Sequence, residues 1–186
     1  APEKTAIDNI LQNCKIEDGK KTVRKYSKGF LQGADDFSHS VVMTQQLNQG
    51  NESVVAAYKD LVAEFNPKLM ILFGIAGSIH EKSKLCDVCI INQVIDYDKR
   101  KEGAEGKIEE RGSAYRVGAK LLVYINEFFN KHGEFPKFDA CENSFDPKFE
   151  IRVGPIGSGN AVVGNPASKI KLWLKDFNSK TLAVET

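Results

Sequence analysis

Two apolar runs of this chain end in glycine-rich turns, and this feature restricts the fold more than any other. Residues 68–77 read KLMILFGIAG, and residues 149–159 read FEIRVGPIGSG. The first run is apolar on both faces, which is typical of an interior strand covered by helices. Helical periodicity occurs before, between and after these runs, at 54–65, 113–133 and 166–177. Strands that alternate with helices predict an α/β layered domain with a mostly parallel sheet.

Shorter segments complete this prediction. We expect Asn51 or Ser53 to cap the helix that follows and Pro67 to stop it. The charged segment 99–112 predicts an exposed loop or an edge hairpin, and 135–149 predicts a loop. The remaining predicted strands are 19–33 (possibly a hairpin), 39–45, 87–98 and 181–185.

Composition excludes several classes of protein. The 186 residues suit one domain over 1–186, with 41% hydrophobic and 27% charged residues. A net charge of +1 gives no bulk attraction to nucleic acid or an acidic membrane surface. No apolar run approaches the length of a membrane span, and the first ten residues do not resemble a signal peptide. We therefore expect a cytoplasmic protein without nucleic-acid or membrane partners.

The four cysteines are Cys14, Cys86, Cys89 and Cys141. The Cys86-x-x-Cys89 spacing is half of a zinc site, but a zinc site needs about four ligands and the sequence holds no second pair. Core thiols are therefore favoured over metal or redox chemistry, and we expect no metal and no cofactor.

The glycine turns have two readings. Glycine in a strand-to-helix turn is more often required because a side chain would not fit in the tight bend than because a ligand contacts the backbone. However, ligands of α/β sheets sit beyond the carboxyl ends of the strands, where both turns are predicted to lie. Both turns are followed by small polar residues, which favours a pocket.

The ordered motifs MTQQLNQGNESVVAA, LFGIAGSI, LCDVCIINQVIDYD, GPIGSGNAVV and TLAVE are more specific than any one of them. Together they resemble the nucleoside phosphorylase and nucleosidase superfamily, most closely the methylthioadenosine/S-adenosylhomocysteine nucleosidase branch. The resemblance covers residues 22–186. It implies a three-layer αβα domain with a central mixed, mostly parallel sheet, and cleavage of an N-glycosidic bond. Such a site must stabilise an oxocarbenium-like ribose and protonate the leaving base.

The resemblance also implies site residues. Ile75, Ala76, Gly77 and Ser78 match the family's turn beside the ribose and base, where bare backbone approaches the substrate. The stretch from Gly159 matches a family turn that carries S-G-D-A and an apolar base-packing residue. It supplies Asn160, Ala161, Val162 and Val163 as base-site candidates, with plain core packing as the alternative for the two valines.

Acidic residues at the two ends of the chain match the family only in part. Glu185 matches the first acid of the family's V-E-M-E signature and is expected on the ribose side of the site. Glu3 matches the acid that activates water, with an exposed N-terminal side chain as the alternative. The family's first strand, its second signature acid and its base-protonating aspartate have no match here. We therefore expect a fragment that lacks the first strand and the C-terminal strand-helix units.

The attacking nucleophile is water or phosphate. Some phosphorylases of the superfamily carry an arginine at the position of Leu72, and an apolar side chain cannot offset a buried phosphate charge. Water is therefore favoured, and a purine nucleosidase acting on an adenosine-type nucleoside, as a homodimer, is the predicted function. The alternatives are a phosphate-dependent phosphorylase and a non-catalytic nucleoside-binding, sensor or storage module.

Other polar and aromatic residues carry weaker indications. His80 lies just beyond the first turn and is expected at the surface. Asp96, Tyr97 and Asp98 follow an apolar run, where capping or a turn is the default role. The aromatic residues of the two later helices are expected to pack rather than to stack on a base; they are Phe128, Phe129 and Trp173.

Overall fold

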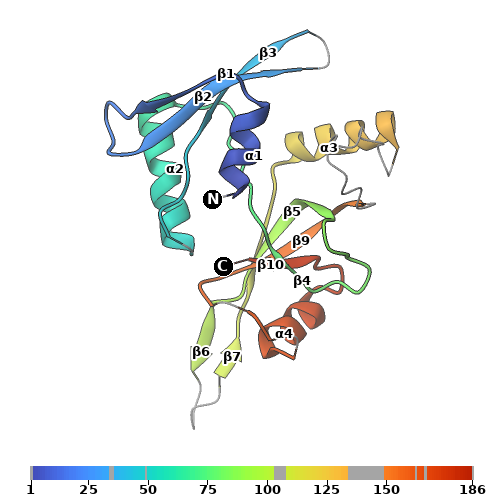
Figure 1. The fold of residues 1–186 in the computed structure, drawn as a ribbon. Coiled ribbons are helices and arrows are strands. Elements are labelled where there is room, and N and C mark those ends of the chain that lie inside the picture. Colours follow the sequence, from blue (N-terminus) through green and yellow to red (C-terminus); the bar gives the residue numbers. More distant parts are fainter. Residues whose placement is uncertain are drawn as a thin grey trace. The chain divides into compact units, whose positions relative to one another are not determined.

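The computed structural model describes residues 2–33, 36–48, 50–102, 108–133, 149–161, 163–165 and 167–185. Its contacts divide the chain into two compact units, Ala1–Gly74 and Ile75–Thr186. Each unit has its own sheet, and each is described by itself (Figure 1). The single domain expected over 1–186 stays a prediction.

The first unit is a three-stranded antiparallel sheet with two helices. Strand β2 lies in the centre, between β1 and β3. The turn between β1 and β2 begins at Gly19, whose N–H donates to the Arg24 carbonyl over 2.8 Å. The elements are α1 (Pro2–Ile10), β1 (Gln12–Asp18), β2 (Lys25–Gln32), β3 (Ser38–Met43) and α2 (Asn51–Phe65).

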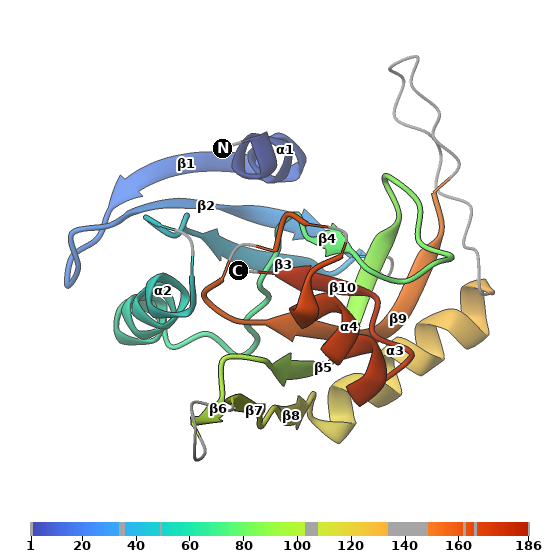
Figure 2. The same ribbon diagram turned by 90° about the horizontal axis from the view of Figure 1, so that it is seen from below.

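Helix α2 lies beside the end of this sheet where β1 turns into β2 (Figures 1 and 2). The ring of Tyr26 on β2 is almost fully buried and meets Phe65 edge-on, with 4.8 Å between the ring centroids. The buried Arg24 pairs with Asp60, one turn and a half earlier on the helix. Aromatic packing and a charge pair therefore fix the same end of α2 to β2.

The second unit contains a five-stranded sheet in the order β4-β10-β9-β5-β8. Its three central strands, β10, β9 and β5, run parallel, and both edge strands run antiparallel to their neighbours. The strands are β4 (Gly77–Ser78), β5 (Val88–Asp96), β8 (Ser113–Arg116), β9 (Ile151–Ser158) and β10 (Ala183–Glu185). This mixed sheet, with helices α3 and α4 on opposite sides of it in Figure 1, confirms the predicted α/β class.

The core of the second unit forms between the sheet and α4 (Lys169–Phe177). Ser168 caps this helix and accepts a hydrogen bond from the Ile170 N–H over 3.2 Å. Leu174 is fully buried, and an added Cβ at Gly157 of β9 would lie 2.4 Å from it. The absence of a side chain at Gly157 therefore lets the helix approach the strand. The buried cluster comprises Ile79, Ile95, Tyr97, Leu174 and Val184.

Proline occupies the middle of the central strand β9. Pro155 has no N–H to give to a ladder, so proline in sheets is largely confined to edges and bulges. Here the β5–β9 pairing shifts by one residue between Ile91 and Gln93, and Gln93 is the partner of Pro155. The Pro155 carbonyl still accepts from the Leu182 N–H, over 2.9 Å, on the β10 side. The bulge in β5 therefore accommodates the proline.

The remaining elements of the second unit are less buried. Strands β6 (Arg100–Glu102) and β7 (Ile108–Glu110) pair with each other as the edge hairpin that the sequence predicted. Helix α3 (Ala119–His132) has no buried residue and ends at Gly133, whose N–H donates to the Phe129 carbonyl over 2.8 Å. This is the C-terminal cap expected from the sequence.

Four expectations are corrected. Residues 68–76 are not a buried strand: they are irregular, and Ile71 and Leu72 are 80% and 72% exposed. The prediction that Asn51 or Ser53 caps α2 is wrong. Gly50 precedes the helix without a side-chain cap, and the Ser53 hydroxyl instead accepts a hydrogen bond from the Asn48 N–H. The predicted helix from 113 begins at 119, after strand β8. Cys86 is exposed rather than buried.

Some expectations lie outside the described residues, namely most of the loop at 135–149, Cys141, Val162 and Pro166. Among the described residues, no helix is both long and apolar enough to cross a membrane.

Candidate functional site

The carboxyl ends of the three parallel strands meet at one edge of the sheet. Asp96 of β5 pairs with Ser158 of β9, and Ser158 pairs with Glu185 of β10. Strand β4 runs antiparallel to β10 with Gly77 opposite Val184, so the chain before Gly77 enters along the same edge. The two glycine stretches therefore meet, as expected for a site at the ends of parallel strands.

The second glycine turn is built tightly onto β5. The Gly159 N–H points to the Glu185 carbonyl at 3.4 Å, and the Tyr97 hydroxyl donates to the Ala161 carbonyl over 2.9 Å. Gly159 is buried, and an added Cβ would lie 2.3 Å from the Tyr97 ring. Glycine is thus sterically required at this position, in line with the steric reading of the turn.

Asp98 joins the end of β5 to the same turn. Its Oδ2 accepts from the backbone N–H of Asn160 over 2.7 Å and from the Asn160 side-chain amide over 2.9 Å. The Asp98 N–H in turn donates to the Asp96 carboxylate over 3.0 Å. The predicted turn role of these aspartates is confirmed, and it acts on the turn at 159–161, far away in the sequence.

The site residues predicted from the sequence fall into three groups. Ile75, Ala76, Gly77, Ser78 and Asn160 are exposed, and Glu185 is half-buried. Ala161 and Val163 are half-buried and pack against the core cluster, as in the packing alternative for Val163. Val162 lies outside the described residues, and Glu3 is on α1 of the other unit. Their roles towards a nucleoside stay predictions.

A second polar group at this edge was not found from the sequence. The Lys99 ammonium donates to the Ser113 hydroxyl over 3.0 Å and to the Tyr115 hydroxyl over 2.8 Å. The hydrogen bond from Lys99 lowers the pKa of Tyr115 and raises that of Lys99. Ser113 pairs with Asp96, which places this group beside the end of β5. The alternation of polar and apolar residues in SAYR, residues 113–116, is the signal for strand β8, although the sequence pattern predicts a helix there.

The opposite end of β5 and β9 carries a different set of charges. Asp87 accepts from the N–H groups of Lys84 and Glu150, each over 2.9 Å, and from Arg152 Nε over 3.0 Å. Burial alone would raise the pKa of Asp87, but these hydrogen bonds and the guanidinium outweigh it and lower the pKa. Arg152 also pairs with Glu150 and donates to the Lys82 carbonyl over 2.8 Å.

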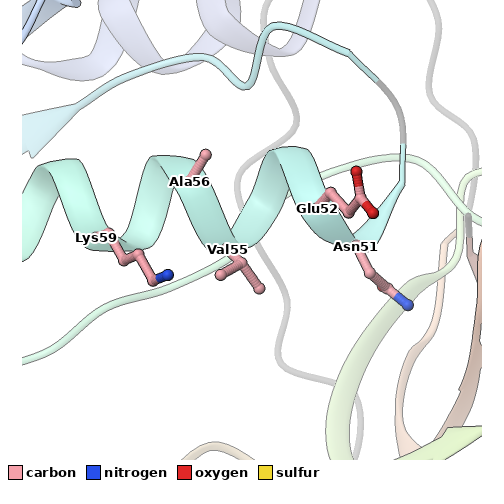
Figure 3. Close-up of a pocket in the computed structure, with 5 residues that line it drawn as sticks. All are labelled: Asn51, Glu52, Val55, Ala56 and Lys59. Carbon is pink, nitrogen blue, oxygen red and sulfur yellow. The ribbon is translucent and has the colours of Figure 1, made fainter.

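The described residues form a surface hollow in each of the two units. One, of about 340 Å³, is on the face of α2 (Figure 3). Its surface is almost wholly apolar, formed by Asn51, Glu52, Val55, Ala56 and Lys59. The other, of about 460 Å³, lies over the Arg152 network, next to Glu81, Lys82 and Lys84. Because the hollow on α2 is lined by a single helix, it offers no convergent polar groups for chemistry.

Among the described residues, no group of three or more His, Cys, Asp or Glu side chains is placed to hold a metal ion. His80 is half-buried, and its Nδ1 accepts from the Lys82 N–H over 3.2 Å. Trp173 packs on the core cluster as predicted, and Phe128 is partly exposed.

Comparison with known proteins gives one curated relative and many solved structures. A 5'-methylthioadenosine/S-adenosylhomocysteine nucleosidase of Staphylococcus haemolyticus is 26% identical over 151 residues, which are 80% of this chain and 58% of the relative. The chain thus spans less than two thirds of that relative's length.

The solved structures share the fold. The S-adenosylhomocysteine nucleosidase of Streptococcus pyogenes, in complex with 5-methylthiotubericidin, matches with a TM-score of 0.69 at 19% identity, covering 99% of this chain and 69% of that one. The MTA/SAH nucleosidase of Streptococcus pneumoniae, in complex with 8-aminoadenine, matches with a TM-score of 0.69 at 19% identity, covering 100% and 72%.

The model of one protein family, described as the phosphorylase superfamily, matches residues 7–186. This match takes in both glycine stretches, the Asp98–Asn160 contact and Glu185. The chain therefore belongs to the phosphorylase superfamily, as its ordered motifs indicated.

Proposed function

We propose that this chain belongs to a purine nucleosidase that hydrolyses the N-glycosidic bond of an adenosine-type nucleoside, such as methylthioadenosine or S-adenosylhomocysteine. The observation that carries the proposal is the 26% identity to a nucleosidase of that specificity over 80% of the chain. The meeting of both glycine stretches with Glu185 at one edge of the sheet supports it. The products are a free base and a ribose derivative.

Each group at this edge has a part in the proposed reaction. The exposed backbone of Ala76 and Gly77 approaches the ribose and base. The half-buried Glu185 carboxylate accepts hydrogen bonds from ribose hydroxyls, which holds the sugar as positive charge grows on it. The turn at 159–161 borders the base. Glu3, which belongs to α1 of the other unit and not to this edge, is proposed from the family resemblance alone as the acid that activates the attacking water.

Water is the proposed nucleophile because of the residue at position 72. Phosphate is usually held by arginine, whose planar fork matches two phosphate oxygens. Leu72 is apolar and occupies the position at which some phosphorylases of the superfamily carry that arginine. A leucine offers no donor to a dianion, which favours hydrolysis over phosphorolysis.

The test is the release of base from a panel of methylthioadenosine, S-adenosylhomocysteine and adenosine by the full-length protein, followed by chromatography. We expect adenine without added phosphate. Ribose 1-phosphate that forms only with phosphate would instead identify a phosphorylase. Ligand binding by calorimetry with no released base would identify a non-catalytic module and overturn the proposal.

A matched pair of variants links the activity to this edge of the sheet. Glu185→Gln removes the charge from the proposed ribose-side group, and we expect kcat/KM to fall about 100-fold, or roughly 3 kcal/mol of transition-state stabilisation. Glu127→Gln, at an exposed position on α3, is the control and should leave kcat/KM unchanged. Equal effects of the two variants would contradict a role for Glu185.

A homodimer and a cytoplasmic location are part of the same proposal. Their support is the membership of the superfamily and, for the location, the free thiols of Cys14, Cys86 and Cys89. Analytical ultracentrifugation of the full-length protein would test the dimer, and a single species at the monomer mass would contradict it.

A further inference from the structure

We propose that Asp98 is a positioning residue of this site, which holds the turn at 159–161 against the end of β5 and thereby shapes the base side of the pocket. The inference rests on the proposed function only for the substrate involved. The contact itself joins two segments 62 residues apart in the chain. It assigns a role to the polar group that follows β5.

The first step is the double hydrogen bond. One oxygen of Asp98 accepts both the backbone N–H and the side-chain amide of Asn160, over 2.7 and 2.9 Å. A charged acceptor makes stronger hydrogen bonds than a neutral one. Because both donors belong to one residue, the contact fixes the backbone of Asn160 and also the plane of its amide.

The second step is the anchoring of Asp98 itself. Its own N–H donates to the Asp96 carboxylate over 3.0 Å, at the last residue of β5. The N–H of the neighbouring Tyr97 donates to the Ser158 carbonyl over 3.1 Å, and the Tyr97 hydroxyl donates to the Ala161 carbonyl. Asp98 is therefore fixed by the end of β5, and it holds the exposed Asn160 in place relative to that strand end.

The third step is the polarity of the pair. An aspartate facing an amide can accept hydrogen bonds, whereas two carboxylates at 2.9 Å would repel each other. The Asp98 N–H is bonded to Asp96, and the Lys99 ammonium lies 4.0 Å from the Asp96 carboxylate. A carboxylate at position 160 would thus face the charged carboxylate of Asp98. Exchanging the two residues, Asp98→Asn together with Asn160→Asp, is therefore a specific test of this hydrogen-bonded pair.

The experiment uses the full-length protein and four variants. In Asp98→Ala the turn loses its acceptor, so we expect KM for methylthioadenosine to rise about tenfold with kcat changed less than about threefold. Asp98→Asn keeps an oxygen at the same place and should stay within about threefold of wild type. Asn160→Asp should resemble Asp98→Ala, and the double variant Asp98→Asn/Asn160→Asp should recover. Asp176→Ala, an exposed site on α4, is the control.

A second measurement does not depend on turnover. Hydrogen exchange of the Asn160 backbone amide, followed by NMR, should be at least about tenfold faster in Asp98→Ala than in wild type, and near wild type in Asp98→Asn and the Asp176 control. If wild type releases no base, the proposed function fails while this exchange still decides the contact. Unchanged exchange in Asp98→Ala, or no recovery in the double variant, would overturn the positioning role.

Discussion

The two ends of the β5–β9 strand pair are each closed by an aspartate, but the partners differ. At the amino end, the Asp87 side chain is 2% exposed and meets Arg152 and two backbone N–H groups. At the carboxyl end, Asp98 meets the neutral and exposed Asn160. An aspartate therefore joins β5 to β9 at both ends. The contact of Asp87 is buried and includes a charged partner, whereas the contact of Asp98 is exposed and has a neutral partner.

This difference indicates a structural role for Asp87 and a functional role for Asp98. A buried carboxylate that accepts several hydrogen bonds is costly to disturb. An aspartate with a neutral amide partner at the surface contributes less to stability, and it lies at the end where ligands of α/β sheets approach. The comparison therefore predicts stability effects at Asp87 and functional effects at Asp98.

The largest effect is expected from Asp87→Ala. It leaves the N–H groups of Lys84 and Glu150 without their acceptor and removes the partner of Arg152 Nε, so we expect the free energy of unfolding to fall by about 3 kcal/mol. Urea denaturation of the full-length protein measures this change. The kcat/KM of the remaining folded protein should be unchanged, and a loss of activity without a loss of stability would reverse the roles of the two ends.

Acidification is expected to remove part of the same contribution. The pKa of Asp87 is lower in the folded chain than its ordinary value of 3.8, so the unfolded chain binds the proton first. The contribution is complete above about 3.8 and is lost as pH falls through the folded pKa. Urea midpoints of wild type and Asp87→Asn between pH 2 and 6 should therefore converge at the acidic end, and parallel curves would contradict this origin.

A smaller loss of stability is expected from Asp98→Ala, about 1 kcal/mol, because the two N–H donors of the exposed Asn160 can donate to water instead. The measurement is the same urea titration, with Asp176→Ala as the control. A loss as large as that of Asp87→Ala would mean that both ends are equally structural.

The smallest effect concerns the thiols near the amino end. Cys86 is exposed, whereas burial, aided by nearby Asp87, raises the pKa of the half-buried Cys89. We expect iodoacetamide to modify Cys86 before Cys89 at pH 8, because the thiolate is the reactive form. Mass spectrometry of peptides over time gives the order, and equal rates would show that this end opens readily.

Local patterns predicted most of the fold. The apolar strand at 87–98, the amphipathic helix at 54–65 and the hairpin at 99–112 carry their signals in their own residues, and the structure contains all three. The run at 68–76 carries an equally strong apolar signal and is nevertheless exposed and irregular. Burial of a strand depends on neighbours on both sides, which the segment itself does not encode. The contact-based division of the chain falls within this run, at Gly74.

The candidate site was predictable in part for the same reason. The glycine turns and their position at strand ends are predicted from the sequence, and the structure brings both stretches to one edge of the sheet. The contact from Asp98 to Asn160 was not readable, because it joins residues that only the parallel pairing of β5 and β9 brings together. The sequence pattern does not predict the group of Lys99, Ser113 and Tyr115, because it predicts a helix from residue 113 where the structure has strand β8.

The bulge opposite Pro155 has a consequence for insertions and deletions. Side chains of a strand alternate between faces, so the loss of one residue ordinarily turns all later residues over. At Asn92 the pairing already absorbs one extra residue, and Gln93 to Asp96 keep their partners on β9. Removing Asn92 would therefore leave the fully buried Ile95 facing the core, whereas removing Val94 would turn Ile95 outward. Related chains are expected to vary in length at the bulge and not in the residues that follow it.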